Sequence, residues 1–524
     1  MRLPTKIFAL CGLLIAALLL RIWAIDYDLP YIYHPDEPVN IIVTHRILSS
    51  SDLNPHFFGY PSLLYYINCV AYYLYSFVGH LTGLLQPQVL MPLTMVDMGV
   101  TRSPQPDLVL LARVITAFFG AGTVALTYVL GTRVLDDDRS ALLGALVVAV
   151  APTNVELSRL MAPDTFATFF VVATVVAATY VQKTGRPIAY AVTGFLVGLS
   201  ASTKYNTAVV LLSLVAAHFY SNRSPRRDEL LLLGGVASAI GFVLGTPFSV
   251  LDWSTFIAAI QAEGTHYSTG HPGMEGNALR WYLSYMWASA GLLYMCSAFE
   301  MIRATVARSK GLLLLSAFPI GYFIFITSFE VRNDRTLLPI TPFLYLLSAS
   351  FLFYLLRVAT RIESSGTRRI TLGIILACAL VALLQPVVNT FRDTTQLVRS
   401  DSRRMARLWI EHDIPPGSHI ALEAYSPFVD PERYVVQGFR IITVHPLEWY
   451  MQNGFEYLIA SEGMYGRFFR EPNRYPKEIA AYNDLFDRLV PVKTFPDDNF
   501  EIRIYKLADG DPATTTGRNP ATAR

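Results

Sequence analysis

Long runs of apolar residues, separated by short polar connections, make up most of the first 390 positions of the chain. A helix needs about 20 apolar residues to cross a hydrocarbon layer about 30 Å thick. About eleven runs approach this length, at residues 7–25, 108–132, 140–157, 163–182, 188–203, 205–221, 230–250, 281–303, 312–329, 336–357 and 370–390. The pattern predicts a polytopic α-helical membrane protein with about 11 transmembrane helices.

The pattern changes after residue 390. About 36 of the 82 charged residues lie in the last quarter of the chain, whereas the whole chain is 53% hydrophobic and only 16% charged. Period-2 and helical patterns alternate there, with helices expected at 401–412 and 476–489 and strands at 420–424, 434–436, 455–460 and 500–507. We therefore expect a transmembrane domain over residues 1–390 and a C-terminal α/β domain over 391–507. Residues 508–524, rich in Thr, Gly, Pro and Ala, are expected to be a disordered tail.

The distribution of Lys and Arg predicts the orientation. The short connections near 183–186, 223–227, 303–310 and 357–369 are basic, which places them in the cytoplasm together with the N-terminus. An odd number of crossings then puts the C-terminal domain on the extracytoplasmic side, as expected for a protein of a bacterial inner (plasma) membrane. The net charge of only +2 offers no basic surface for nucleic acid, so we exclude a nucleic-acid partner.

The first outer loop, residues 26–107, contains a second apolar segment at 61–85. This segment is long enough to span the membrane, but it is crowded with Tyr, a residue typical of membrane interfaces. If it crossed, every basic connection after it would move outside. We therefore predict that it lies along the surface as part of a juxtamembrane helix pair.

Several polar residues fall on the outer side of this topology. Asp36 and Glu37 follow the first helix between two prolines, and a carboxylate held there can act as a general base or a metal ligand. Alternatively, Asp36 caps the helix that follows. Asp164 begins an apolar helix, where an acid is often a cap; with Arg159 five residues before it, it also suits a site for a charged headgroup. We interpret Asp36, Glu37 and Asp164 as catalytic candidates.

Cations occur on the same side. Lys204 interrupts a long apolar stretch at its outer turn, and Arg332 and Arg335 begin another helix. A cation at that depth needs an anion, either a lipid headgroup or a bound phosphate substrate. We therefore assign Lys204, Arg159, Arg332 and Arg335 to phosphate binding.

The outer loop after residue 265 contains His266 and His271 without a tight ligand spacing. Histidines in such loops are more often unliganded than metal-bound, so the signal for a site is weak. A divalent metal ion held by His266 and His271 is the one cofactor that these residues suggest.

The chain resembles the C-type membrane glycosyltransferases, specifically the family of protein O-mannosyltransferases and aminoarabinose transferases. The order of its short motifs and their shared outer side carry the resemblance. The matching stretches are residues 33–38, 59–66, 112–117, 158–164, 198–204, 335–342, 409–417 and 504–507. In one departure, the chain has Gly59 where aminoarabinose transferases have an acid just before the Pro of the loop motif, which argues against the aminoarabinose and lipid A substrate pair.

The resemblance implies transfer of a sugar from a polyprenyl-phosphate carrier to a lipid, glycan or protein acceptor on the outer face, with inversion at the anomeric carbon. Asp36 matches the first-loop aspartate that serves as base or orients the acceptor, and Asp164 matches a second acid. Lys204 and Arg335 match cations around the carrier phosphate. Electrostatic stabilisation of a phosphate leaving group and a carboxylate that takes the acceptor proton are the chemistry such a transfer needs.

Two other classes of protein remain as alternatives. A secondary transporter also has many helices and intramembrane charges, but the long first outer loop and the outer domain fit it poorly. A non-catalytic envelope assembly protein would bind glycan or peptide through its outer domain. An enzyme would lose its product on mutation of Asp36, whereas the binding protein would retain its ligand.

Overall fold

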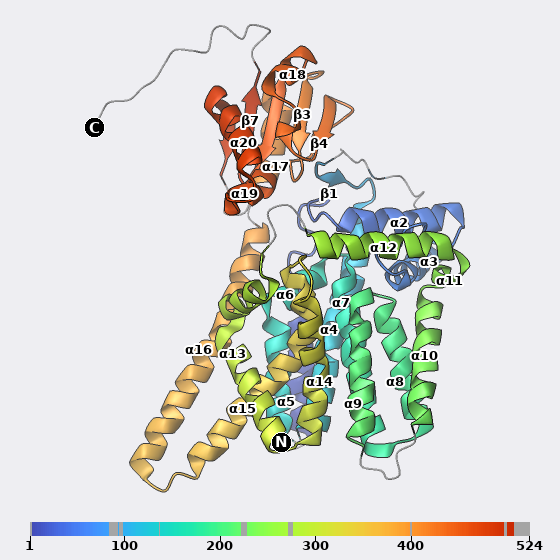
Figure 1. Ribbon diagram of the computed structural model, residues 1–524, viewed down its shortest axis with the longest axis vertical. Helices are drawn as coiled ribbons and strands as arrows, with labels where there is room; N and C mark the ends of the chain where they lie inside the picture. Colours follow the sequence, from blue (N-terminus) through green and yellow to red (C-terminus); the bar gives the residue numbers. More distant parts are fainter. Residues whose placement is uncertain are drawn as a thin grey trace.

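The computed structural model shows a helical bundle, a layer of helices lying across one end of it, and an α/β domain beyond that layer (Figure 1). It describes residues 3–82, 93, 98–135, 137–221, 228–270, 276–398, 401–496 and 500–507. The predicted tail, 508–524, lies outside the described residues.

Each of the eleven predicted apolar runs overlaps one bundle helix, although the runs at 140–157 and 205–221 each also include a second, short helix. These helices are α1 (Leu3–Ile22), α4 (Pro106–Val134), α5 (Asp138–Val150), α7 (Pro163–Thr184), α8 (Pro187–Ala201), α9 (Leu211–Phe219), α10 (Glu229–Gly245), α13 (Ala278–Val306), α14 (Lys310–Ile326), α15 (Thr341–Thr360) and α16 (Ser365–Val398). By length and composition, five described helices can cross a membrane, or six if α5 counts as one span with the bent continuation formed by α6 (Pro152–Glu156) and the 3-10 helix η1 (Leu157–Arg159). The total of about 11 crossings stays a prediction.

Small residues bring bundle helices into close contact. At Gly194 of α8, an added Cβ would lie 2.0 Å from the carbonyl oxygen of Gly234 in α10, and at Gly198 it would lie 2.2 Å from that of Ser238. Such contacts are the main source of helix association in lipid, where the hydrophobic effect between helices is absent.

A buried arginine stabilises the bend after α5. Arg21 donates to the carbonyl oxygens of Ala149 at 3.0 Å and Val148 at 3.3 Å, which end the helix before a bend of 65°. A cation is favourable at the C-terminal end of a helix dipole. Gly120 leaves room for it, because a Cβ there would lie 2.8 Å from Arg21 Nε.

The layer across the bundle end consists of α2 (Glu37–Ser50), α3 (Leu63–Thr82), α11 (Phe248–Leu251) and α12 (Trp253–Thr269). In Figure 1, α2 and α12 run across the ends of the bundle helices, with α3 below α2. Val70, Leu74, Phe77 and Leu81 form an exposed apolar stripe along α3, as in a helix lying in a membrane interface. This arrangement agrees with the prediction that the segment does not cross; residues 83–85 lie outside the described residues.

The C-terminal domain is built on a five-stranded sheet of order β4-β3-β5-β7-β6. The strands are β3 (His419–Glu423), β4 (Val435–Phe439), β5 (Tyr457–Ser461), β6 (Pro491–Phe495) and β7 (Ile502–Lys506), and the helices are α17 (Ser402–Asp413), α18 (Leu447–Gln452), α19 (Glu462–Arg470) and α20 (Pro476–Arg488). Each predicted element coincides with one of these, whereas β6, α18 and α19 were not predicted. The helix α16 continues past the predicted boundary at residue 390, so it carries the domain away from the bundle.

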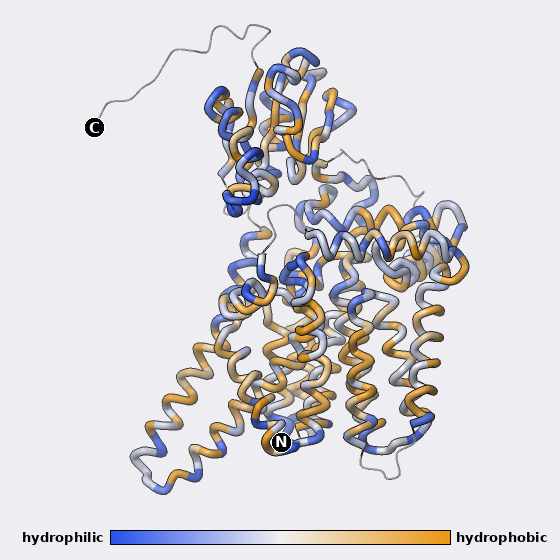
Figure 2. The backbone as a smooth tube through the Cα atoms, viewed as in Figure 1, coloured by the Kyte–Doolittle hydropathy of each residue, from blue (hydrophilic) through white to orange (hydrophobic). Residues whose placement is uncertain are grey.

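Polar connections gather at the opposite end of the bundle. Lys6 near the N-terminus forms an ion pair with Asp138, and Lys183 donates to the carbonyl oxygen of Arg133 at 3.1 Å. Gln182 donates to the carbonyl oxygen of Lys310 at 2.9 Å. The tube coloured by hydropathy shows an orange bundle with blue connections at this end (Figure 2). The described connections therefore share one side, as the distribution of Lys and Arg predicts. The predicted connection at 223–227 lies outside the described residues, and the orientation in the membrane stays a prediction.

Labelling of single cysteines tests that orientation. In a variant whose four native cysteines are replaced, we expect Val490→Cys, in the C-terminal domain, to react with a membrane-impermeant maleimide in intact cells. Arg308→Cys, in a basic connection, should react only after permeabilisation. Labelling of Arg308→Cys from outside would contradict the proposed sidedness.

Candidate active site

A cavity of about 520 Å³ lies between the layer of α2 and α12 and the bundle ends. Asp36, Tyr60, Lys204 and Arg335 line its polar part. The side chains of α14 and of the loop after it, including Phe325, Ile326 and Phe329, line an apolar part. The cavity is therefore amphipathic.

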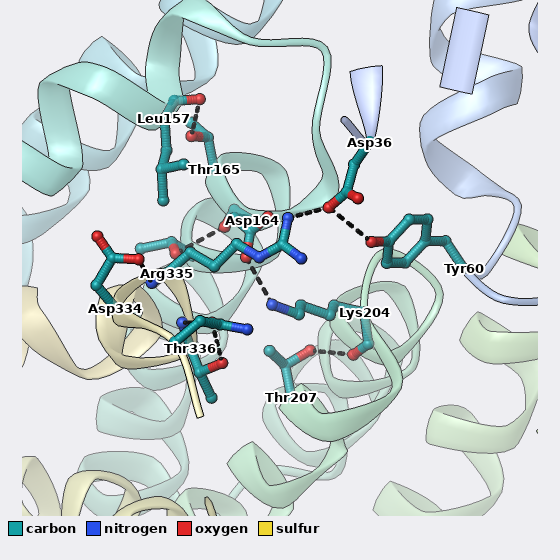
Figure 3. A network of polar contacts seen from close by, with 12 residues as sticks. Asp36, Tyr60, Leu157, Asp164, Thr165, Lys204, Thr207, Asp334, Arg335 and Thr336 are labelled. Carbon is teal, nitrogen blue, oxygen red and sulfur yellow. Dashed lines mark hydrogen bonds and ion pairs between the residues drawn. The ribbon is translucent and has the colours of Figure 1, made fainter. Parts of the chain in front are cut away.

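Asp36 lies at the start of α2 and points into this cavity. Its carboxylate accepts a hydrogen bond from the Tyr60 hydroxyl at 3.1 Å and forms an ion pair with Arg335 (Figure 3). Among the described residues, it makes no hydrogen bond that caps α2. Asp36 thus occupies the N-cap position of α2, as the capping alternative predicts, but its side chain faces the site instead of bonding to the helix.

The surroundings of Asp36 keep it ionised. Burial raises the pKa of its carboxyl. The charge of Arg335 and the hydrogen bonds from Arg335 and Tyr60 lower that pKa by more than burial raises it, so the pKa lies below the ordinary value. In this state Asp36 is an anion at neutral pH and a weak base. Its basicity would increase if Arg335 moved to another anion.

Asp164 and Lys204 form the second ion pair of the site. Asp164 lies in the first turn of α7, and its Oδ1 accepts a hydrogen bond from Lys204 Nζ at 2.6 Å. Both side chains are buried. Arg335, in the first turn of the 3-10 helix η3 (Asp334–Ile340), lies between the two carboxylates (Figure 3). The outer ends of four segments thus bring together two anions and two cations.

Glu37 has a different environment from its neighbour. It is 0% exposed, and its carboxylate accepts hydrogen bonds from Arg113 Nε at 2.9 Å and Nη2 at 2.8 Å. It also accepts a bond from the amide of Met161 at 3.0 Å. Since this carboxylate is enclosed and fully bonded, we assign it to holding α2 on α4 rather than to catalysis.

Two of the predicted phosphate-binding arginines lie away from the cluster. Arg159 donates to the carbonyl oxygen of Leu20 at 2.6 Å and to Thr394 Oγ1 at 3.0 Å. It lines a second cavity of about 870 Å³ between the bundle and the C-terminal domain. Arg332 lies against Gly276, where an added Cβ would be 3.3 Å from its Nη1. Of the four predicted cations, only Lys204 and Arg335 meet at the first cavity.

Of the two predicted metal ligands, only His266 is among the described residues. His266 lines the first cavity from α12, one turn after Glu263, whereas His271 lies outside the described residues. Within the described ranges, no group of three or more His, Cys, Asp or Glu side chains is arranged to hold a metal ion. The described residues therefore do not make a metal site, and metal binding stays a prediction.

Tyr60 and Glu263 in the cavity lining, and Arg113 behind it, were not predicted from the sequence. Gly59 explains the place of Glu263, because a Cβ at Gly59 would lie 3.3 Å from its Oε1 and 2.7 Å from the Phe57 ring. The absent side chain leaves room for an acid from α12. Only the motif positions of Tyr60 and Arg113 could have indicated them, since both lie in stretches that carry the family resemblance.

The buried pair of Glu37 and Arg113 gives a testable prediction. Glu37→Ala leaves a buried guanidinium without its counter-ion, a loss of about 3–5 kcal/mol. We expect a clearly lower thermal unfolding temperature of the purified protein in detergent. Asp36→Asn, at the adjacent but partly exposed carboxylate, is the control and should lose much less. The double variant Glu37→Leu/Arg113→Met should regain most of the loss; an unchanged unfolding temperature for Glu37→Ala would mean that the pair is dispensable.

Comparison with known proteins gives a consistent result. Residues 109–247 match the family model described as dolichyl-phosphate-mannose-protein mannosyltransferase. No curated protein matched the chain. The fold is similar to that of the oligosaccharyltransferase of Archaeoglobus fulgidus in its apo form, with a TM-score of 0.54 and 12% identity over 90% of this chain and 71% of that one.

A second similar structure is ArnT from Cupriavidus metallidurans bound to undecaprenyl phosphate, with a TM-score of 0.52 and 14% identity over 97% of this chain and 99% of that one. A third is the A. fulgidus oligosaccharyltransferase AglB in complex with an inhibitory peptide and a dolichol-phosphate, with a TM-score of 0.52 and 12% identity over 88% of this chain and 70% of that one. At such identities the likeness shows the fold alone. Residues 109–247 thus match the dolichyl-phosphate-mannose-protein mannosyltransferase family, and the chain has the fold of the C-type membrane glycosyltransferases, which confirms the resemblance seen in its sequence.

Proposed function

We propose that the protein transfers a sugar from a polyprenyl-phosphate-linked donor to an acceptor on the extracytoplasmic face of the membrane, with inversion at the anomeric carbon. The single observation that carries the proposal is the cluster of Asp36, Arg335, Asp164 and Lys204 at an amphipathic cavity. The sugar and the acceptor class, whether lipid, glycan or protein, are not specified by this cluster.

The donor fits the two parts of the cavity. Lys204 has three N–H donors and Arg335 has five, so both retain donors beyond those used for Asp164 and Asp36. These can bind the carrier phosphate, while Phe325, Ile326 and Phe329 offer an apolar surface for the first part of the polyprenyl chain. Two of the similar structures hold undecaprenyl phosphate or dolichol-phosphate, according to their descriptions.

The transfer breaks the bond between the anomeric carbon and the phosphate oxygen and forms one from that carbon to the acceptor oxygen. Asp36 takes the acceptor proton, and polyprenyl phosphate leaves with its charge neutralised by Arg335 and Lys204. Attack from the face opposite the phosphate inverts the anomeric centre. When the phosphate engages Arg335, the pKa of Asp36 rises towards its ordinary value, because a lowering charge is shared.

The acceptor can reach Asp36 through the second cavity, which lies against the segment just before this residue. Tyr33, His34 and Pro35 line the second cavity, together with charged side chains that include Glu156 and Arg403. A cavity with both donors and acceptors suits a hydroxyl-bearing acceptor better than an apolar one. This arrangement also favours an enzyme over the transporter and assembly-protein alternatives, since the second cavity is lined by residues 33–35, directly before the carboxylate of Asp36 in the first cavity.

Asp36→Asn tests the catalytic assignment. The change keeps the size of the side chain and removes its charge and basicity, so we expect turnover with a polyprenyl-phosphate sugar to fall by about 10²- to 10⁴-fold. Binding of polyprenyl phosphate, measured separately, should be close to wild type. Near-normal turnover would move the role of base to Asp164.

Lys204→Gln tests the phosphate site. Glutamine can still donate a hydrogen bond to Asp164 but carries no charge, so the carrier loses a charge-assisted bond of about 1.5–3 kcal/mol. We expect the Kd for polyprenyl phosphate to rise about 10- to 100-fold. Lys183→Gln, the same change at the opposite end of the bundle, is the matched control and should bind normally. Equal Kd values for both variants would exclude Lys204 from phosphate binding.

A further inference from the structure

The segment that leads into Asp36 is held by the C-terminal domain as well as by the bundle, where Ile32 joins a core cluster with residues of α4. Tyr33 belongs to the hydrophobic core cluster of that domain, which also contains Ile410 and Leu422. The Tyr31 ring lies 5.2 Å from that of Phe428 in the same domain. The side chains of the outer loop thus enter the sheet domain immediately before the catalytic carboxylate.

Arg403, in the first turn of α17, contacts Tyr33 at two points and also lies over the ring of Phe500. Its Nη1 donates to the Tyr33 carbonyl oxygen at 3.2 Å, and its guanidinium lies 4.7 Å from the Tyr33 ring and 4.5 Å from the Phe500 ring. Asp401 orients the guanidinium through Nε at 3.0 Å and Nη2 at 2.6 Å. The side chain is buried, so this stacked and bidentate arrangement is fixed.

A second arginine and a strand pair make further contacts between this segment and the C-terminal domain. Arg407, one turn further along α17, lies 4.0 Å from the centre of the Tyr31 ring. The strand β1 (Tyr31–Ile32) pairs with β2 (Thr101–Arg102). The residues just before β2 bond to the domain, since the amide of Val100 donates to the Ser426 carbonyl oxygen at 3.2 Å and that of Tyr425 to the Met98 carbonyl oxygen at 3.1 Å.

We propose that the C-terminal domain positions the Asp36 carboxylate, and that Arg403 is the positioning residue through which it acts. Three peptide units separate Tyr33 from Asp36, a reach of about 11 Å at most. Pro35 further restricts this short segment. A shift of Tyr33 is therefore passed on to Asp36, whose bond to Tyr60 depends on its position. This inference rests on the proposed role of Asp36.

The contacts of the C-terminal domain reach the segment before Asp36 but not the cavity proposed to bind the carrier. The first cavity, with Lys204 and the apolar side chains of α14, has none of the described residues of the C-terminal domain in its lining. Loss of these contacts should therefore lower turnover without weakening the binding of the carrier. A displacement of about 1 Å in a reacting group costs on the order of 10²-fold in rate.

The test compares Arg403→Met and Arg403→Lys with wild type in the full-length protein in detergent. Methionine keeps the apolar stem, and lysine keeps the charge but cannot make the fork or the planar stack. We expect kcat to fall about 10- to 100-fold in Arg403→Met and less in Arg403→Lys, with the Kd for polyprenyl phosphate within about twofold of wild type. Arg433→Met is the matched control, because Arg433 lies 5.4 Å from the ring of Tyr434 within its own domain; its kcat should be unchanged.

Variants of Tyr33 separate positioning from simple loss of folding. The ring of Tyr33 is what the Arg403 guanidinium stacks on, so Tyr33→Phe, which keeps the ring, should lower kcat much less than Tyr33→Ala. Tyr33→Ala should lower kcat as Arg403→Met does, while protein that remains folded still binds the carrier. A wild-type kcat for Arg403→Met, or a parallel loss of kcat and carrier binding, would overturn the proposal. Absence of transfer by the wild type with every polyprenyl-phosphate sugar tried would instead overturn the proposed function.

Discussion

The balance of buried charge is the constraint on which the outer end of this molecule depends. An ion taken out of water costs several kcal/mol unless a counter-ion and hydrogen bonds compensate it. Asp36, Asp164, Lys204 and Arg335 come from four separate segments, and each carboxylate is paired with a cation from another segment. The same requirement therefore assembles the cavity and joins the layer of α2 to the bundle. Behind it, the closed pair of Glu37 and Arg113 fixes the start of α2 without taking part in the cavity.

The helices of the bundle end where this cluster begins, and their ends supply the irregular backbone that a site needs. The short 3-10 helix η2 (Tyr205–Val210) follows Lys204, and the 3-10 helix η3 contains Arg335. The helix α7 starts one residue before Asp164. Non-helical backbone at membrane depth is tolerated only where protein or a polar cavity surrounds it. The polar cluster therefore provides surroundings in which the irregular backbone is tolerated. In turn, the short segments direct the charged side chains into the cavity.

The sequence predicted the helices and the side of the site better than the partners within it. Runs of apolar residues and basic connections reflect the membrane itself, so each of the eleven runs overlaps a helix. The choice between Asp36 and Glu37 could not be made, because both are adjacent carboxylates and only the position of Arg113 on α4 decides which one is enclosed. In the same way, Arg159 and Arg335 look alike in sequence but face different cavities. In the C-terminal domain, Val490, just before β6, and Val492, within it, are both exposed. The strand therefore has no clear alternation of buried apolar and exposed polar residues, which explains why it was not predicted.

The pairing of the cluster has a consequence for the proposed transfer. Two carboxylates and two cations leave no net charge, so a phosphate binds by exchange of partners rather than by attraction to a positive surface. Arg335 is the side chain that can be exchanged, because it lies between Asp36 and Asp164 and is less buried than Lys204. As the phosphate takes up Arg335, Asp36 keeps the Tyr60 hydroxyl but loses part of the field that lowers the pKa of its carboxyl. Binding of the donor thereby makes the base stronger while the carrier phosphate occupies the site, which links the two substrates through a single guanidinium.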